Sequence, residues 1–433
     1  MTFTVEEGTA VPEASGQVTG LRLLRSRPDF AWIWSGQMVS RFGDALDLFA
    51  FVWIVLELTG STLMMGTFIM VNVLPNVLLG PFAGVLVDRW SRKRVMLVAD
   101  LGRGLVLAIL ALLWALDLVQ VWMLFVVTFV SSIFETFSAP ARRAVLPLLV
   151  GKENLVAAHG LYSMGDGLAN LFGLAAAGAV VAWLGVLPAI VVDAGTFFFA
   201  AFTVAVAAIP ELERATAPLK VRAFFQELGE GLNFIRSEPV VLTAVLMAGL
   251  ANFALGPMES LLPAHVRQGM GLGPQYVSWV MMAMTAGSLV GGVLISQWLK
   301  GIAEVHLLRA GMVGVGVGYG LMGLSPTVWT LMAAAAGLGL MLPLASSGLG
   351  ALIQRRTPPE RMGRVGSIMG TLVLAAFPLS AGLSGTAAEW FPIPWIYASM
   401  AVFMLAASAG ALWSAPFRRL AREARQERMG AMV

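Results

Sequence analysis

The chain has 433 residues, of which 58% are hydrophobic and only 12% are charged. Globular domains average about 45–50% apolar and 25% charged residues. A soluble protein of this length has to present more charge to water, so the composition excludes a soluble globule and indicates a polytopic membrane protein. The absence of Cys and the wide separation of the three His disfavour disulfides and a metal centre. Membrane topology explains the net charge of +3 better than nucleic-acid binding does.

The apolar residues form twelve predicted spans in two sets of six. A polar cytoplasmic tail at 1–27 comes first, because its acidic residues precede its basic ones, unlike a secretory signal. The first set lies at 30–56, 63–86, 95–116, 120–139, 157–182 and 186–208. The second set lies at 240–264, 275–299, 305–324, 327–352, 366–388 and 393–414. Each is about 20 residues or longer, enough to cross about 30 Å of hydrocarbon as a helix.

These spans predict an N-terminal six-helix bundle at 28–208 and a C-terminal one at 240–415. Between them lies a charged linker at 209–239. In this linker Phe224, Leu228, Leu232 and Ile235 fall on one helical face, which predicts an amphipathic helix on the cytoplasmic surface. A basic cytoplasmic tail at 416–433 is expected to contact anionic membrane lipid.

The distribution of Lys and Arg predicts the orientation. If both termini are cytoplasmic, every Lys and Arg outside the spans lies on the cytoplasmic side except Arg267. This follows the positive-inside rule, and an odd number of spans would destroy the pattern. We therefore expect a multi-pass protein of the bacterial inner (plasma) membrane.

The two halves also repeat. The residues Gly84-Val85-Leu86-Val87-Asp88-Arg89-Trp90 match Gly292-Val293-Leu294-Ile295-Ser296-Gln297-Trp298 in apolar frame, although the second copy lacks the charges. A duplicated six-helix unit around a central cavity is typical of rocking-bundle transporters.

Several motifs carry a resemblance to a known family. Gly84-x-x-x-Asp88-Arg89-x-x-Arg92-Lys93-Arg94 is similar to the signature loop of the major facilitator superfamily. Further stretches resemble its drug:proton antiporter branch, which includes macrolide and enterobactin exporters: Ser40–Leu46, Pro140–Pro147 and Pro359–Val365. The resemblance implies an all-α membrane protein with twelve transmembrane helices in two pseudo-symmetric bundles.

The resemblance also implies a conformational latch at the cytoplasmic side. In relatives such a loop holds the bundles together and breaks when that side opens. The predicted latch residues are Gly84, Asp88, Arg89, Arg92, Lys93 and Arg94, with Glu135 and Arg142 joining their network. The alternative is a fixed structural contact at the cytoplasmic side, whose charges only determine the membrane topology.

Charges inside the spans are the candidates for proton coupling. Arg41, Asp44 and Asp47 lie near the bilayer centre, where each bare charge costs at least about 2.5–3.5 kcal/mol. A carboxyl group in a half-dry cavity can hold or release a proton as its surroundings change. The proton-coupling or cavity set is Asp44, Asp47, Arg41, Gln37, Asp166 and Asn170. A buried ion pair that only fixes helix packing is the alternative, and Asp100 and Arg103, spaced i, i+3, are expected to form such a self-contained pair.

The cavity wall is expected to be apolar and aromatic, which suits a polyspecific site. Candidate substrate-binding residues are Phe49, Trp53, Phe129, Phe253, Glu259 and Phe377.

Together these features predict a monomeric, non-enzymatic exporter that needs no cofactor and exchanges amphipathic drug-, macrolide- or siderophore-like molecules for protons. The stretch Gly173-Leu174-Ala175-Ala176-Ala177-Gly178 lacks the Pro that such antiporters often carry. A proton-independent facilitator or flippase-like carrier for a lipid or metabolite therefore stays an alternative. A non-transporting receptor or assembly partner is a second alternative.

Overall fold

The computed structural model describes residues 20–211, 221–299, 302–413 and 418, and within these residues every regular element is helical. The first six long helices are α2 (Pro28–Thr59), α3 (Thr62–Val87), α4 (Arg92–Ala115), α5 (Val121–Val150), α6 (Leu155–Leu184) and α7 (Val186–Val206). The last six are α9 (Pro239–Ala264), α10 (Pro274–Gln297), α11 (Glu304–Gly323), α12 (Val328–Arg356), α13 (Pro359–Ala387) and α14 (Ile393–Trp413). The short elements are α1 (Gly20–Ser26), η1 (Lys152–Asn154), α8 (Val221–Ser237) and η2 (His265–Gly269).

The long helices coincide with the twelve predicted spans. Within the described parts of the chain, eleven helices are long and apolar enough to cross a membrane. The twelfth, α2, has 32 residues but carries the charges of the first predicted span in its middle. It nevertheless packs against α6 and α7 inside the N-terminal half. Its crossing of the membrane stays a prediction.

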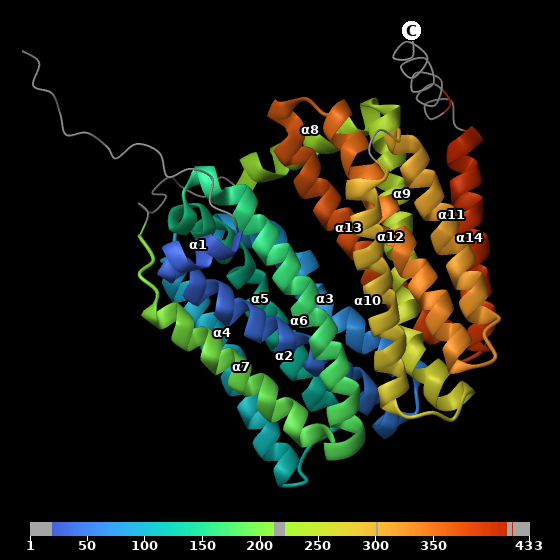
Figure 1. Cartoon of the computed structure of the whole chain (residues 1–433), viewed down its shortest axis with the longest axis horizontal. Coiled ribbons are helices and arrows are strands. Elements are labelled where there is room, and N and C mark those ends of the chain that lie inside the picture. The colour runs from blue at the N-terminus through green and yellow to red at the C-terminus, as the bar shows by residue number, and fades with distance from the viewer. Residues whose placement is uncertain (1–19, 212–220, 300–301, 414–417, 419–433) are drawn as a thin grey trace, which may run out of the picture.

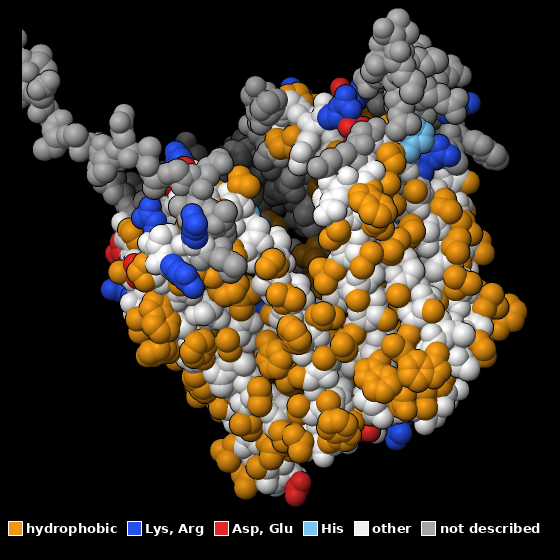
Figure 2. All heavy atoms as spheres, in the orientation of Figure 1, with side chains coloured by type: hydrophobic (Ala, Val, Ile, Leu, Met, Phe, Trp, Pro, Cys, Tyr) orange, Lys and Arg blue, Asp and Glu red, His pale blue; other side chains and the backbone are white. Residues whose placement is uncertain are grey.

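The helices form two bundles, α2–α7 and α9–α14, which lie side by side (Figure 1). The main contacts between the bundles are those of α3 with α13 and of α6 with α10, and α9 also contacts α2 and α3. The bundles separate toward the end where α8 lies, here called the α8 end, and converge at the opposite, distal end (Figure 1). The surface is hollowed between the bundles toward the α8 end (Figure 2).

Small residues produce the convergence at the distal end. A Cβ on Gly66 of α3 would overlap the carbonyl oxygen of Ala381 on α13. On α6, a Cβ on Gly178 would lie 2.7 Å from the Cβ of Ser278 on α10. Since larger side chains would hold these backbones apart, the glycines permit the close packing that membrane helices favour.

Two of the long helices extend well beyond their predicted spans, and one of them is α13, which begins at Pro359 and not at 366. The fourth predicted span ends at 139, but α5 continues through Pro140 and Pro147 to Val150. Proline removes one backbone donor, yet neighbouring helices can satisfy the freed carbonyl, so long membrane helices tolerate it.

The structure describes part of the predicted linker and both copies of the repeat. Helix α8 forms within the predicted linker, and Phe234 and Ile235 on it are buried. The repeated segments end α3 and α10, the second long helix of each bundle. The tails at 1–19 and 419–433 and the linker residues 212–220 lie outside the described residues.

Candidate functional site

A cluster of charged side chains lies inside the N-terminal bundle. Four helices contribute to it: Arg41 and Asp44 come from α2, Arg103 from α4, Glu135 and Arg142 from α5, and Asp166 from α6. These six residues are the charge cluster. Because each helix hides its own backbone polar groups, only side chains can connect the helices electrostatically in a dry interior.

Glu135 lies at the centre of the charge cluster. Its Oε1 lies 2.6 Å from Arg142 Nη2 and 3.3 Å from Arg41 Nη2. Its Oε2 lies 3.1 Å from Arg103 Nη1. One carboxylate that accepts from three guanidinium groups ties α2, α4 and α5 together.

Asp44 is the second acceptor of the charge cluster. Its Oδ1 pairs with Arg103 Nη2, and its Oδ2 lies 3.4 Å from Arg41 Nη1. Arg41 also reaches Asp166 on α6, with 3.9 Å between Nε and Oδ1. Asp166 is about half exposed, so this edge of the charge cluster faces the space between the bundles.

These contacts correct one expectation. Arg103 does not form a self-contained pair with Asp100, because its guanidinium turns across the bundle to Asp44 and Glu135. Glu135 and Arg142 pair with each other from one face of α5, and Glu135 also pairs with Arg41 and Arg103. Helix α5 contacts the Asp88 loop, where Phe137 and Trp90 lie with their ring centres 5.9 Å apart. That Glu135 and Arg142 join the latch network stays a prediction.

The predicted latch loop connects α3 to α4. Asp88 pairs with Arg92 at 3.0 Å, one turn along the chain. Lys93 donates to the carbonyl oxygens of Ala205 and Ala207 at the end of α7, both at 2.8 Å. The backbone N–H of Asp88 donates to Gly84, and Arg94 is exposed. These contacts stay within the N-terminal half, so a latch between the bundles, including one through Arg89, stays a prediction.

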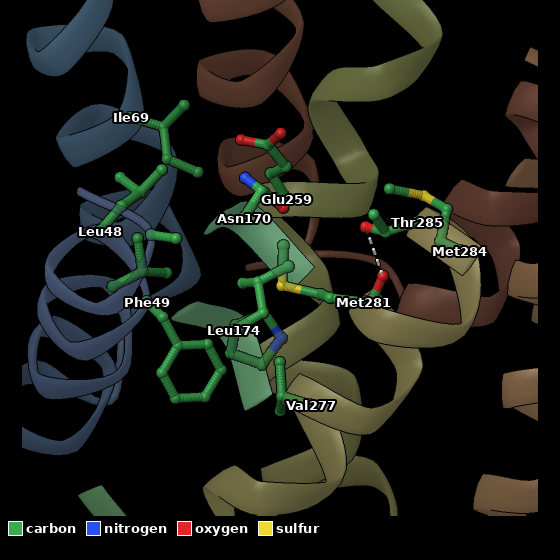
Figure 3. A pocket seen from close by; sticks show the side chains of 13 residues that line it. Leu48, Phe49, Ile69, Asn170, Leu174, Glu259, Val277, Met281, Met284 and Thr285 are labelled. Atoms are coloured by element: carbon green, nitrogen blue, oxygen red, sulfur yellow. Dashed lines mark hydrogen bonds between the residues drawn. The ribbon is translucent and has the colours of Figure 1, made fainter. Parts of the chain in front are cut away.

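A pocket lies between the bundles and next to the charge cluster. Its volume is about 150 Å³, and it is lined by residues of both bundles: Ala45, Leu48, Phe49, Val52, Ile69, Asn170, Leu174, Glu259, Pro263, Val277, Met281, Met284 and Thr285 (Figure 3). Three of the predicted residues, Phe49, Asn170 and Glu259, are among them. Met281 and Met284 supply adaptable apolar walls.

Glu259 is the acidic group of this pocket. It lies on α9, in a pocket lined mainly by apolar side chains with Asn170 and Thr285 as the other polar residues (Figure 3). Within the described residues it forms no ion pair or hydrogen bond. A carboxylate in such surroundings is an anchor for a polar or cationic group of a ligand.

The other predicted wall residues lie elsewhere than in this pocket. Trp53 is buried, with the Arg267 guanidinium 5.9 Å from its ring centre. Phe253 packs against Phe403, and Phe377 contacts the core. Phe129 is partly exposed on α5. Their roles in substrate binding stay predictions.

The two remaining proton candidates lie differently. Gln37 is buried one turn before Arg41 and makes no hydrogen bond to the charge cluster. The Asp47 side chain points toward α7, where its carboxyl group lies next to the carboxyl group of Asp193. Arg103 and Asp193 are not among the site residues predicted from the sequence. Both are charges inside apolar spans, which is the feature that identified Asp44.

Two helical bundles that share a pocket, with charges buried beside it, define the class: this is a multi-pass membrane transporter and not an enzyme. The model of the transmembrane secretion effector family matches residues 21–428. The chain belongs to this family, which is part of the major facilitator superfamily.

Relatives and solved structures agree with this assignment. Macrolide efflux protein A of Streptococcus pyogenes is 30% identical over 365 residues, which cover 83% of this chain and 89% of that protein. The multidrug efflux pump Tap of Mycolicibacterium fortuitum is 28% identical over 356 residues, 80% of this chain and 86% of the pump. The crystal structure of a mutant of the nucleoside transporter NupG superposes with a TM-score of 0.74 at 10% identity. The match covers 90% of this chain and 99% of that one, and shows the shared fold.

Proposed function

We propose that the protein exports amphipathic small molecules, of macrolide, drug or siderophore-like type, from the bacterial cytoplasm in exchange for protons. The main supporting observation is the position of the charge cluster against the pocket. Asp44 precedes the pocket residue Ala45 on α2, and Asp166 lies one turn from the pocket residue Asn170 on α6. A substrate in the pocket can therefore disturb the ion pairs of the groups that bind protons.

The proposed cycle is alternating access by a monomer in the plasma membrane, with both termini and the α8 end in the cytoplasm. The described conformation, hollowed toward the α8 end, then accepts substrate from the cytoplasm. The names of the relatives support small amphipathic substrates. Membrane lipid, which surrounds the helices, is a further proposed partner.

The test uses purified protein in liposomes with an interior pH dye, an imposed proton gradient and erythromycin as the probe. Wild-type protein is expected to move protons when erythromycin is added, and Asp44→Asn is expected to abolish this. The matched control is Asp117→Asn, because Asp117 lies in the turn after α4, away from the charge cluster. Its left-handed backbone suits Asn equally well.

Other outcomes contradict the proposal in distinct ways. Erythromycin flux that ignores the gradient in wild type and Asp44→Asn overturns proton antiport and favours the facilitator. If wild-type liposomes transport neither erythromycin, ethidium nor a catecholate siderophore, the exporter proposal fails and the non-transporting receptor is favoured.

A further inference from the structure

Asp47 on α2 and Asp193 on α7 form a buried pair of acids apart from the charge cluster. Asp47 lies one turn after Gly43 on α2, where the Asp193 side chain of α7 packs against the helix, so the two carboxyl groups are neighbours. Asp193 is 0% exposed. The close approach of the helices is possible because α2 has Gly43 here, where a Cβ would overlap Asp193 Oδ1 and Thr196 Oγ1.

Neither acid has a cation as its partner. In the described structure no ion pair includes Asp47 or Asp193, whereas Asp44 and Glu135 each pair with two or more arginines. The other charged groups that act on the pair are Asp44, on α2 itself, and Arg103 of α4. Among the other acids nearby, Glu135 of α5 and Asp166 of α6 pair with Arg41. Asp100 of α4 is buried near Asp44 and Arg103 and forms no ion pair within the described residues.

Two oxygen atoms of the pair have no donor. Asp47 Oδ1 and Asp193 Oδ2 are fully buried and accept no hydrogen bond. The Thr196 hydroxyl lies 3.1 Å from Asp193 Oδ1, but it also donates to the Asp193 carbonyl oxygen at 2.7 Å. The pair is therefore short of donors, which is unusual for buried polar atoms.

A proton held between the two acids would supply the missing hydrogen-bond donor. Two ionised carboxylates in contact cannot both be stable in a dry interior, because each loses its hydration and repels the other. A single proton held between them removes one charge and converts one acid into a donor for the other. Two carboxyl groups that share one proton are a known arrangement in enzyme sites.

We propose that Asp47 and Asp193 together bind one proton, and that this pair is a proton-binding site distinct from the charge cluster. Its part in transport rests on the function proposed above. When the proton leaves to water in the hollow, the net charge of the pair changes from −1 to −2. Arg103, which now serves Asp44 and Glu135, is the cation close enough to compensate that charge. The release of a proton would thus loosen the ion pairs that hold α2 to α4.

The direct test is infrared difference spectroscopy of the purified full chain, with no substrate present. Wild-type protein is expected to show a C=O stretching band from a protonated, buried carboxyl group that disappears at alkaline pH. Both Asp47→Asn and Asp193→Asn are expected to lose this same band, because an Asn amide donates to the remaining carboxylate without a proton. Asp100→Asn is the matched control, because Asp100 is a buried acid of α4 that forms no ion pair within the described residues. This variant loses any carboxyl band of Asp100 itself and should keep the band that both Asp47→Asn and Asp193→Asn remove.

The two single substitutions also test whether the proton is shared. If neither substitution changes the band, or if wild-type protein has no such band, the proposal is overturned. If each substitution removes a different band, the acids are protonated separately and a shared proton is excluded.

A second pair of variants leaves both acids in place. Thr196→Val removes the hydroxyl beside Asp193 and is expected to shift the frequency of the band. Thr203→Val is its control, because Thr203 is also buried on α7 and donates to the carbonyl oxygen three residues earlier. A spectrum of Thr196→Val that is identical to wild type would contradict the assignment to this pair.

Transport is measured separately in liposomes with erythromycin. Asp193→Asn is expected to lose erythromycin-driven proton movement while it keeps erythromycin binding. If wild-type protein transports no erythromycin, the exporter proposal fails, but the infrared band still decides whether the pair holds a proton. If Asp193→Asn couples protons like wild type, the pair has no part in transport.

Discussion

At the scale of single residues, Arg103 organises the buried charges. Its planar guanidinium has donors in a fork, so it can bind Asp44 of α2 and Glu135 of α5 at once. Its face lies 3.9 Å from the ring centre of Phe197 on α7. One side chain therefore connects four helices by ion pairs and by a cation–π contact.

Arg103→Gln is expected to lower the free energy of unfolding by about 3–5 kcal/mol, because it leaves two buried carboxylates short of a cation. Arg103→Lys should lie between Gln and wild type, since it keeps the charge but loses the fork. Thermal unfolding in detergent micelles measures the change. Arg309→Gln is the control, because Arg309 forms no ion pair within the described residues. If Arg103→Gln and Arg309→Gln lowered the free energy of unfolding equally, the contacts of Arg103 with Asp44 and Glu135 would contribute nothing to stability.

Glu259→Gln tests the acid of the pocket. Binding of ethidium, an amphipathic cation, is expected to weaken about tenfold or more, because a hydrogen bond to a charged group is worth about 1.5–3 kcal/mol. Binding of Nile red, a neutral dye, should change little. Fluorescence titration measures both, and Thr285→Val is the control, since that hydroxyl already donates to Met281. If both dyes lost affinity equally, the carboxylate would matter only for the shape of the pocket.

At the scale of elements, the contact between α3 and α13 closes the distal end. The Thr62 hydroxyl donates to the Gly385 carbonyl oxygen at 2.9 Å. A Cβ on Gly385 would lie 2.5 Å from the carbonyl oxygen of Thr62, against 3.6 Å from the nearest atom, Met70 Sδ, for Gly382 on the same helix. This contact between α3 and α13, here called the seam, therefore has no room for a side chain at Gly385 but has room for one at Gly382.

Gly385→Ala is expected to separate α3 from α13 and to favour conformations open at the distal end. Because the chain has no Cys, spin labels can be placed specifically through Met64→Cys and Trp390→Cys, both exposed near the seam. Double electron–electron resonance should show longer distances between the two spin labels in Gly385→Ala. In Gly382→Ala these distances should equal those of the doubly labelled parent protein. Unchanged distances in Gly385→Ala would mean that the seam adapts without opening.

At the scale of the whole molecule, a surface carboxylate adds a pH-dependent contact between the bundles. Glu389, after α13, accepts from the Ser61 hydroxyl at 2.7 Å and from the Leu63 backbone N–H at 3.2 Å. The Ser61 hydroxyl and the Leu63 amide lower the pKa of Glu389 below its usual range. The ionised carboxylate thus stabilises the N-terminus of α3 and the closed distal end.

Since the pKa of Glu389 is lowered by the contact, its stabilisation is present above the ordinary pKa of Glu and is lost as the pH falls through the lowered value. The same spin labels are expected to report a modest opening of the distal end on acidification. Glu389→Gln should remove that response. A response that persists in Glu389→Gln would have to come from other groups, such as the buried acids.

Much of the whole-molecule architecture follows from the sequence alone. Span length, hydropathy and the distribution of Lys and Arg act along one dimension, so they predict the long helices and the two halves without any knowledge of packing. The same holds for the intramembrane charges, because a charge in an apolar span is conspicuous wherever its helix lies. Arg41, Asp44 and Glu259 could all be recognised in this way.

Partners across the helices were decided by tertiary structure. The i, i+3 spacing suggested Asp100 for Arg103, but long side chains can reach a neighbouring helix as easily as the next turn, and Arg103 reaches Asp44. Helix α5 continues through Pro140 beyond its predicted span, because neighbouring helices can satisfy the carbonyl group that proline leaves free. The meeting of Asp47 with Asp193 depends on how closely α2 approaches α7 at Gly43. Distances between helices are set by the packing of many side chains, and no local pattern in the chain encodes them.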